Sequence, residues 1–278
     1  MTRLAFTMAI IAAIGLGGTA RSQPAPVPAL TVYSAGSMAG ALGAMLKRYT
    51  AETGRPVDLH TGPAGQLLQK IEAGDKVDLF VSANMAHPQK LTAAGKSTAT
   101  VVFARNRICV AARPDVALTS ANLLQKLLDP QVKIGTSTPR ADPGGDYAWA
   151  LFDKADTVRP GAGATLKAKA QQLVGGTGGL VVPKGQNAVE YFLAEHRVDV
   201  FVGYCSSHET TRDPGFDQVE LPAALAIQAD YGMTVLTTGT DSARREAADR
   251  LALYLMSPAA QAMMVPYGFT PVAAASPP

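Results

Sequence analysis

Charged side chains are scarce in this sequence, and neither sign dominates. Asp, Glu, Lys and Arg together make up 17% of the 278 residues, with 25 basic against 22 acidic side chains. Because the basic residues form no stripe, nucleic acid is not expected as a partner. Apolar residues make up 47% of the chain, which excludes intrinsic disorder except at the ends.

Cysteine is nearly absent, since the chain has only Cys109 and Cys205. Two cysteines do not make the framework of a disulfide-rich protein. Both stand in apolar, strand-like surroundings, which favour buried free thiols, although an oxidising compartment would permit a bond between them. We therefore expect two free thiols.

Long apolar runs are absent apart from one at the N-terminus. Residues 1–3 form a short basic start, residues 4–16 are almost all apolar, and residues 17–20 are small. This order is typical of a secretory signal peptide, and the run is shorter than the roughly 20 residues of a membrane span. We expect a signal peptide over residues 1–22 and a soluble mature protein in the periplasm; an uncleaved anchor is the alternative.

Short apolar runs alternate with helical patterns after the N-terminal segment. Strands are predicted at residues 30–33, 57–60 and 76–82, and a helix at residues 66–73. Another helix is predicted to end at Gly54, with an apolar face formed by Met38, Leu42, Met45, Leu46 and Tyr49. This alternation predicts right-handed crossovers and a mainly parallel sheet.

A similar pattern resumes after a predicted strand at residues 107–112. It comprises helices at 122–128, 145–152, 187–196 and 242–256, and strands at 132–135, 198–202 and 231–236. The fold class is therefore α/β, with two lobes joined by two crossover strands near residues 110–114 and 226–234. We expect residues 30–111 and 230–272 in the first lobe and residues 112–229 in the second.

Four strand ends open into loops that are rich in Gly, Ser and Pro and lead into helices. These loops cover residues 34–38, 61–65, 141–145 and 185–187. Ligands of α/β sheets bind at the carboxyl ends of strands, where helix N-termini offer N–H groups and the positive end of the helix dipole. Each loop alone is ordinary cap or turn chemistry. Together, facing one cleft, they would bind an anion without any Lys or Arg.

Several motifs, taken in order, resemble those of one protein family. Residues 69–83 give the most specific match, to a "Q-I-E-x-G … A-D-[LV]-F-I-S-A" segment, and residues 31–38 resemble a strand with an Ala-Ala-Ser-Leu loop. Residues 143–148 resemble Pro-Ala-Gly-x-Tyr-Ala, residues 198–204 a strand with a binding tyrosine, and residues 267–269 a terminal Tyr-Gly-Phe. The family is that of the periplasmic molybdate/tungstate-binding proteins of ABC importers, which have the type II periplasmic-binding-protein fold.

The resemblance implies capture of molybdate or tungstate by neutral donors and delivery to an ABC permease in the inner membrane. It implies a monomer with no cofactor and no catalytic residue. The implied ligand-binding groups are the Ser37 hydroxyl and N–H, the Gly144 and Gln186 N–H groups, and the Tyr204 phenol. A fully ionised oxyanion accepts hydrogen bonds on every oxygen, whereas a protonated one such as hydrogen phosphate also needs an acceptor.

The sequence departs from the family in ways that leave the ligand open. The second loop lacks the family's serines, so Ala64 or Gly65 would donate through the backbone there, and Gln66 could replace the hydroxyl. Asp146 lies near the start of a helix, where a carboxylate suits the dipole but would repel an anion if it faced the cleft. Another oxyanion is therefore the next candidate.

Two further alternatives use the segment that follows Tyr204. A transition metal or its chelate would be held by softer donors, taken from Tyr204, Cys205, His208 or His60. The rival from a different functional class is a hydrolase with Cys205 as nucleophile, for which no motif places a base nearby.

Overall fold

A computed structural model of the chain describes residues 27–183, 186–206, 215–237, 239 and 241–273. The expected signal peptide and His208 lie outside these ranges. Within them, no helix has the length and hydropathy that a membrane crossing needs.

The first lobe is built on three parallel strands in the order β2-β1-β3. These are β1 (Leu30–Ala35), β2 (Val57–Gly62) and β3 (Leu79–Ser82). In the chain, β1 is followed by the short 3-10 helix η1 (Gly36–Met38) and α1 (Ala39–Thr53), β2 by α2 (Ala64–Glu72), and β3 by α3 (Ala86–Ala93). The apolar face predicted for α1 is buried in full, and the helix ends at Gly54 with φ of 71°. The predicted parallel arrangement is confirmed for these strands.

The second lobe repeats this arrangement with three other parallel strands, in the order β7-β5-β6. They are β5 (Ile134–Ser137), β6 (Gln171–Val174) and β7 (Val200–Tyr204), and the helices around them are α4 (Leu123–Leu128), α5 (Pro143–Val158), α6 (Ala162–Lys169) and α7 (Ala188–Ala194). The sequence patterns predicted α4, α5, α7, β5 and β7 but missed α6 and β6.

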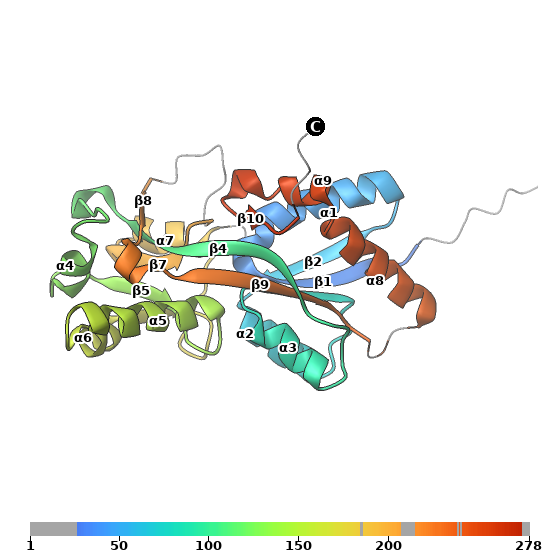
Figure 1. Cartoon of the computed structure of the whole chain (residues 1–278), viewed down its shortest axis with the longest axis horizontal. Helices are drawn as coiled ribbons and strands as arrows, with labels where there is room; N and C mark the ends of the chain where they lie inside the picture. The colour runs from blue at the N-terminus through green and yellow to red at the C-terminus, as the bar shows by residue number, and fades with distance from the viewer. Residues whose placement is uncertain (1–26, 184–185, 207–214, 238, 240, 274–278) are drawn as a thin grey trace, which may run out of the picture.

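Two long strands, β4 (Val101–Ala112) and β9 (Gln228–Val235), run between the lobes (Figure 1). Residues 101–107 of β4 pair with β9, whereas residues 108–112 pair with β7 and with β8 (Asp217–Glu220). Since β9 also pairs with β3, hydrogen bonding continues along the order β2-β1-β3-β9-β4-β7-β5-β6. The junction pairs are antiparallel, so the sheet is parallel within each lobe and mixed as a whole.

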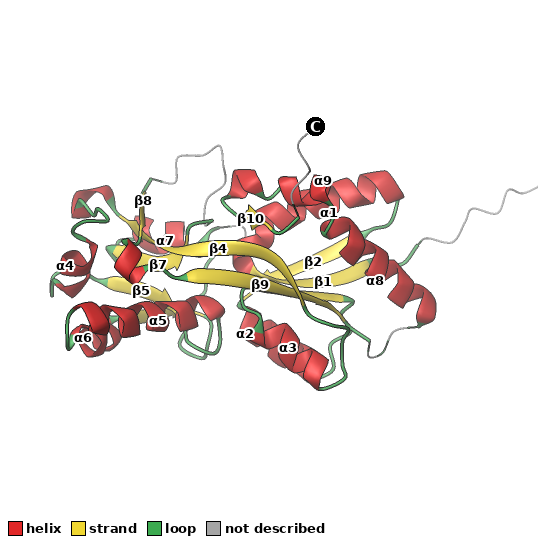
Figure 2. Ribbon diagram, in the orientation of Figure 1, coloured by secondary structure: helices red, strands yellow, loops and turns green. Residues whose placement is uncertain are grey.

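The C-terminal elements return to the first lobe. They comprise α8 (Ser242–Leu255), α9 (Pro258–Ala262), the 3-10 helix η4 (Val265–Tyr267) and β10 (Thr270–Pro271), which pairs with β4. Contacts of α8 with α1 and β1 place it on the first lobe. Figure 2 shows helices packed against the strands throughout the molecule. Two further 3-10 helices are η2 (Pro114–Val116), between β4 and α4, and η3 (Ala223–Leu225), between β8 and β9.

Asp78, in the most specific sequence motif (residues 69–83), is the buried partner of an ion pair with Arg244. Asp78 is 1% exposed and accepts hydrogen bonds from the Thr31 N–H at 2.7 Å, from Arg244 Nε at 2.7 Å and from Arg244 Nη2 at 2.6 Å. Arg244 Nη2 also donates to the carbonyl oxygen of Ala29. Asp78, directly before β3, therefore connects β3 with β1 and α8 through these hydrogen bonds.

The expectation of two free thiols is wrong, because Cys109 and Cys205 form a disulfide with a Cα–Cα distance of 4.9 Å. The reason lies in the sheet: Cys109 on β4 is opposite Gly203 on β7, and the Cys205 N–H donates to the Arg107 carbonyl oxygen. The two cysteines are 96 residues apart in sequence and become neighbours only when β4 pairs with β7.

Candidate functional site

A cavity of about 1150 Å³ lies between the two lobes, at the ends of their parallel strands. Its lining includes η1 and the loop after β2 on one side. On the other side it includes the loops after β5 and β6 and the end of β7. This is the edge of the sheet where α/β proteins bind ligands.

Four of the six predicted ligand-binding residues line the cavity: Ser37, Gly144, Gln186 and Tyr204. Ala64 and Gly65 are buried, and the same loop reaches the cavity lining through Pro63 and Gln66. Three of the four predicted loops therefore line the cavity with a predicted residue, namely Ser37, Gly144 or Gln186. The second loop lines it with Pro63 and Gln66, which flank Ala64 and Gly65.

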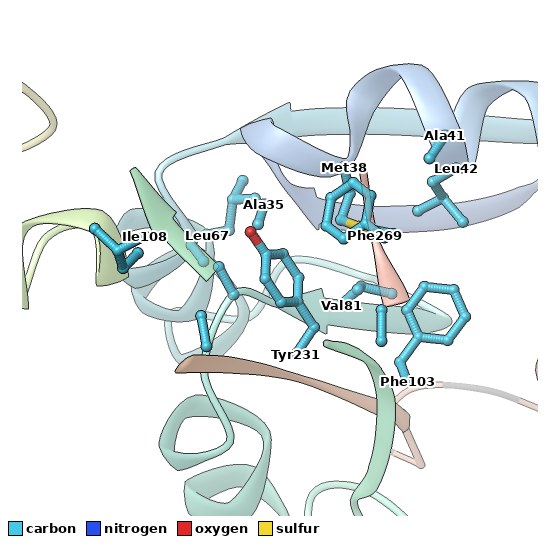
Figure 3. Close-up of a cluster of buried hydrophobic side chains, with 14 of the residues drawn as sticks. Ala35, Met38, Ala41, Leu42, Leu67, Val81, Phe103, Ile108, Tyr231 and Phe269 are labelled. Carbon is cyan, nitrogen blue, oxygen red and sulfur yellow. The ribbon is translucent and has the colours of Figure 1, made fainter. Parts of the chain in front are cut away.

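Ser37 belongs to a hydrogen-bond network behind the cavity. Its hydroxyl lies 2.7 Å from that of Tyr231, and Asn106 Nδ2 donates to the Tyr231 oxygen at 3.4 Å and to Ser206 Oγ at 2.6 Å. The Tyr231 ring lies among apolar side chains with its oxygen toward Ala35 (Figure 3). Burial raises the pKa of Tyr231, so the phenol stays neutral. The network joins η1 to the end of β7 through both crossover strands.

Tyr204 lines the cavity, and its hydroxyl oxygen is buried beside it. This oxygen makes no well-aligned hydrogen bond with the described residues, although the Tyr231 phenol lies nearby. The ring packs edge-on against Tyr147 and Tyr231, with centroid distances of 6.1 and 5.7 Å. Burial raises the pKa of Tyr204 well above its ordinary value, which keeps the proton on the phenol. A neutral O–H beside a cavity, without a well-aligned partner, is suited to donating to an acceptor on a bound solute.

One carboxyl group in the cavity wall is that of Asp142, which caps the N-terminus of α5. Its Oδ1 accepts the Gly144 N–H at 2.8 Å. Burial, and the nearby charge of Asp146, raise the pKa of Asp142 to about 6, against the lowering effect of hydrogen bonds from Gly144 and Ser137. The Gly144 N–H therefore already has an acceptor in this structure.

The other two groups considered on this side also have partners. The Gln186 N–H donates to the Pro183 carbonyl oxygen at 3.1 Å. Asp146 accepts the Arg140 N–H at 2.8 Å and lies outside the cavity lining. Of the two acidic residues at the start of α5, Asp142 lines the cavity and Asp146 does not. An Asp directly before a Pro at a helix start is a recognisable N-cap signal.

The hydrolase hypothesis used a free Cys205 thiol, which the disulfide removes, and the metal hypothesis loses Cys205 as one of its four candidate donors. His60 is exposed and lies edge-on to Tyr33 at a centroid distance of 5.5 Å, outside the cavity lining. Across the described part of the chain, no three His, Cys, Asp or Glu side chains gather as they would around a metal ion.

Gly65 lies where the two lobes meet beside the cavity. A Cβ atom on this residue would lie 2.4 Å from the Arg140 carbonyl oxygen and 2.7 Å from that of Ala141. These contacts are with backbone atoms of the loop that precedes α5, so they cannot be relieved by a side-chain rotation. The close approach of the lobes seen here needs a glycine at this position.

We expect Gly65→Ala to hold the lobes apart and to weaken solute binding at least tenfold. The measurement is solute titration together with small-angle scattering, in which the variant should stay more extended when solute is present. Gly43→Ala is the matched control, because a Cβ there would meet only Leu59 Cδ2 at 4.0 Å. Equal affinity and equal compaction in the two variants would contradict a role for Gly65 in closure.

Comparison with known proteins gives matches over most of the chain. The family model for bacterial extracellular solute-binding proteins matches residues 30–270. An uncharacterized protein of Pasteurella multocida is 37% identical over 196 residues, which cover 70% of this chain and 80% of that protein.

Three solved structures are similar in fold at low sequence identity. The periplasmic molybdate-binding protein of Azotobacter vinelandii has a TM-score of 0.70 at 17% identity, covering 87% of this chain and 98% of its own. The sulfate-binding protein SubI of Mycobacterium tuberculosis has a TM-score of 0.71 at 18% identity. The match covers 88% of this chain and 87% of SubI. AfuA of Actinobacillus pleuropneumoniae, with fructose-6-phosphate bound, has a TM-score of 0.68 at 14% identity. The match covers 90% of this chain and 87% of AfuA.

These likenesses extend across both lobes and the strands that join them. The two-lobed α/β architecture is that of the periplasmic binding proteins. With the family model covering nearly all the described residues, the chain belongs to the family of bacterial extracellular solute-binding proteins.

Proposed function

We propose that this chain is the periplasmic binding component of an ABC importer and that it captures a solute through an oxyanion group. Molybdate and tungstate are the simplest candidates, and the sequence resemblance points to them first. The observation that carries the proposal is the buried Tyr204 hydroxyl, which has no well-aligned protein partner and belongs to a residue that lines the cavity together with Ser37. An oxyanion oxygen would accept a hydrogen bond from this hydroxyl.

Backbone donors at two helix starts of the first lobe support the same reading. Neither η1 nor α2 has a side-chain cap at its N-terminus, and neither has an acidic residue in its first turn. The first N–H groups of a helix have no partner within the helix, and the dipole favours negative charge there. Donors from Ser37 and from Ala64 or Gly65 would thus bind an anion without a basic side chain.

The delivery cycle follows from the two-lobed shape. We propose that residues 30–111 with 230–272 and residues 112–229 move as two lobes, hinged at β4 and β9, and close on the solute. The change of β4 pairing between Arg107 and Ile108 supports a hinge there. A signal peptide over residues 1–22 would place the mature chain in the periplasm, where an inner-membrane permease receives the solute.

Isothermal titration calorimetry of the mature chain tests the proposed function. Molybdate, tungstate, sulfate, phosphate and a phosphate ester should include at least one ligand that binds with one-to-one stoichiometry. Divalent zinc and nickel should give no comparable heat. Binding of a metal alone, with no response to any oxyanion or oxyanion ester, would contradict the proposal.

We expect Ser37→Ala and Tyr204→Phe each to weaken binding of the oxyanion by about 1–3 kcal/mol, because each leaves an acceptor on a buried ligand unpaired. Calorimetry with the best oxyanion ligand measures the loss. Tyr254→Phe is the matched control, since that hydroxyl is also buried without a well-aligned partner but lies outside the cavity lining. If all three variants bind like the unaltered chain, Ser37 and Tyr204 do not hold the solute.

A further inference from the structure

The two walls of the cavity differ in charge. The first-lobe wall offers Ser37 and helix starts that lack acidic residues. The second-lobe wall carries the carboxyl groups of Asp142 and Glu195, and the described lining contains no Lys, Arg or His. A solute that satisfies both walls therefore needs hydrogen-bond acceptors at one end and donors at the other.

Asp142 makes this wall unsuitable for a fully ionised oxyanion. Its carboxylate is held in place as the cap of α5 by the Gly144 N–H, and like charges repel strongly in a site that is partly shielded from water. A solute O–H aimed at the same carboxylate would instead form a charge-assisted hydrogen bond. The group that repels molybdate or sulfate thus attracts an oxyanion that carries a hydroxyl.

The size of the cavity favours a solute with an organic body. A tetrahedral oxyanion fills about the space of three water molecules, or roughly 100 Å³ at about 30 Å³ per water. The cavity measures about 1150 Å³, and four aromatic residues line it, namely Tyr191, Phe201, Tyr204 and Tyr267. Even after narrowing by closure of the lobes, the remaining space suits carbon atoms that pack against these rings.

We propose that Asp142 is a specificity-determining residue, and that the solute is a phosphate monoester whose hydroxyl group donates to it. The inference rests on the proposed function, because it assumes that the first-lobe wall holds an oxyanion group. The O–H has two possible sources, namely a proton on the oxyanion itself, as in hydrogen phosphate, or a hydroxyl on the organic body. The cavity volume favours the second source.

Calorimetry near neutral pH with four probes separates these cases. Sulfate has no O–H, inorganic phosphate carries one on the oxyanion, methyl phosphate is an ester without a hydroxyl, and glycerol 3-phosphate is an ester with hydroxyls. The unaltered chain should bind glycerol 3-phosphate at least tenfold more tightly than methyl phosphate or sulfate. Tighter binding of inorganic phosphate than of glycerol 3-phosphate would contradict the proposal that the solute has an organic body.

Asp142→Asn is the informative variant, because asparagine is an equally good helix cap and keeps an acceptor for the Gly144 N–H. It should reduce the preference for glycerol 3-phosphate over sulfate at least tenfold, chiefly by improving sulfate binding. Asp153→Asn is the control on the same helix, where the carboxylate is exposed and pairs with Lys167; it should keep the preference.

Failure of this inference is distinguishable from failure of the proposed function. Two results would overturn the role of Asp142 and leave oxyanion capture standing. One is a preference of the unaltered chain for sulfate or molybdate. The other is an unchanged preference in an Asp142→Asn variant whose circular dichroism spectrum is normal. Absence of binding by every oxyanion and ester in the unaltered chain would overturn both. The preference of the unaltered chain is informative even if the variant does not fold.

Discussion

Asp78→Ala is expected to lower the free energy of unfolding by about 2–3 kcal/mol, the usual cost of leaving hydrogen-bond donors around a buried charged acceptor without that acceptor. The carboxylate accepts three hydrogen bonds, and its loss leaves the Thr31 N–H and the Arg244 guanidinium without their acceptor. Three elements, β1, β3 and α8, lose a common attachment. Urea denaturation followed by circular dichroism measures the change.

The control for this prediction is Asp58→Ala, which removes an exposed carboxylate on the neighbouring strand β2. Surface substitutions of this kind change stability by about 0.5 kcal/mol or less. If Asp78→Ala destabilises the chain no more than Asp58→Ala does, the buried ion pair does not have the structural role assigned to it.

Replacing both cysteines with serine is expected to lower the free energy of unfolding by about 2–5 kcal/mol. The bond closes a loop between residues 96 positions apart, and a loop of that length restricts the unfolded chain strongly. Because Cys205 follows Tyr204 directly, the same bond holds the Tyr204 backbone next to β4. Urea denaturation with and without a reductant measures the effect.

The reductant provides its own control. Reduction should lower the stability of the unaltered chain toward that of the Cys109→Ser, Cys205→Ser variant and should leave the variant unchanged. Equal unfolding midpoints for the oxidised chain and the variant would show that the disulfide adds nothing to stability.

Local patterns in the sequence predicted the helices and strands of both lobes well. The face of α1 and its end at Gly54 follow from helical periodicity and from the left-handed backbone that a glycine accepts. The strand–helix alternation likewise predicted the parallel strands of the first lobe, and β5 and β7 of the second. These features depend on residues close together in the chain, which is why periodicity captures them.

Features that depend on distant pairing were missed or wrong. Free thiols were favoured over a disulfide because nothing near Cys109 or Cys205 shows that β4 and β7 are neighbours. The same strand pairing brings Asn106, Ser206 and Tyr231 into one network, and no local pattern distinguishes these residues from other polar residues in or beside apolar strands.

The candidate site shows the same division. Ser37 and Tyr204 were predicted at strand ends and both line the cavity. Asp142 was passed over in favour of Asp146, because helix position alone does not show which of two nearby carboxylates faces the cavity. The packing of Gly65 against the Arg140 backbone joins the two lobes, and its requirement for glycine appears only in three dimensions.

The most direct test of oxyanion capture is a crystal structure of the chain with the oxyanion or oxyanion ester that binds it most tightly. The account predicts the anion in the cavity between the lobes, with one oxygen within hydrogen-bond distance of the Tyr204 hydroxyl and another within reach of Ser37. An anion bound outside this cavity, or in it without contact to either residue, would contradict the account.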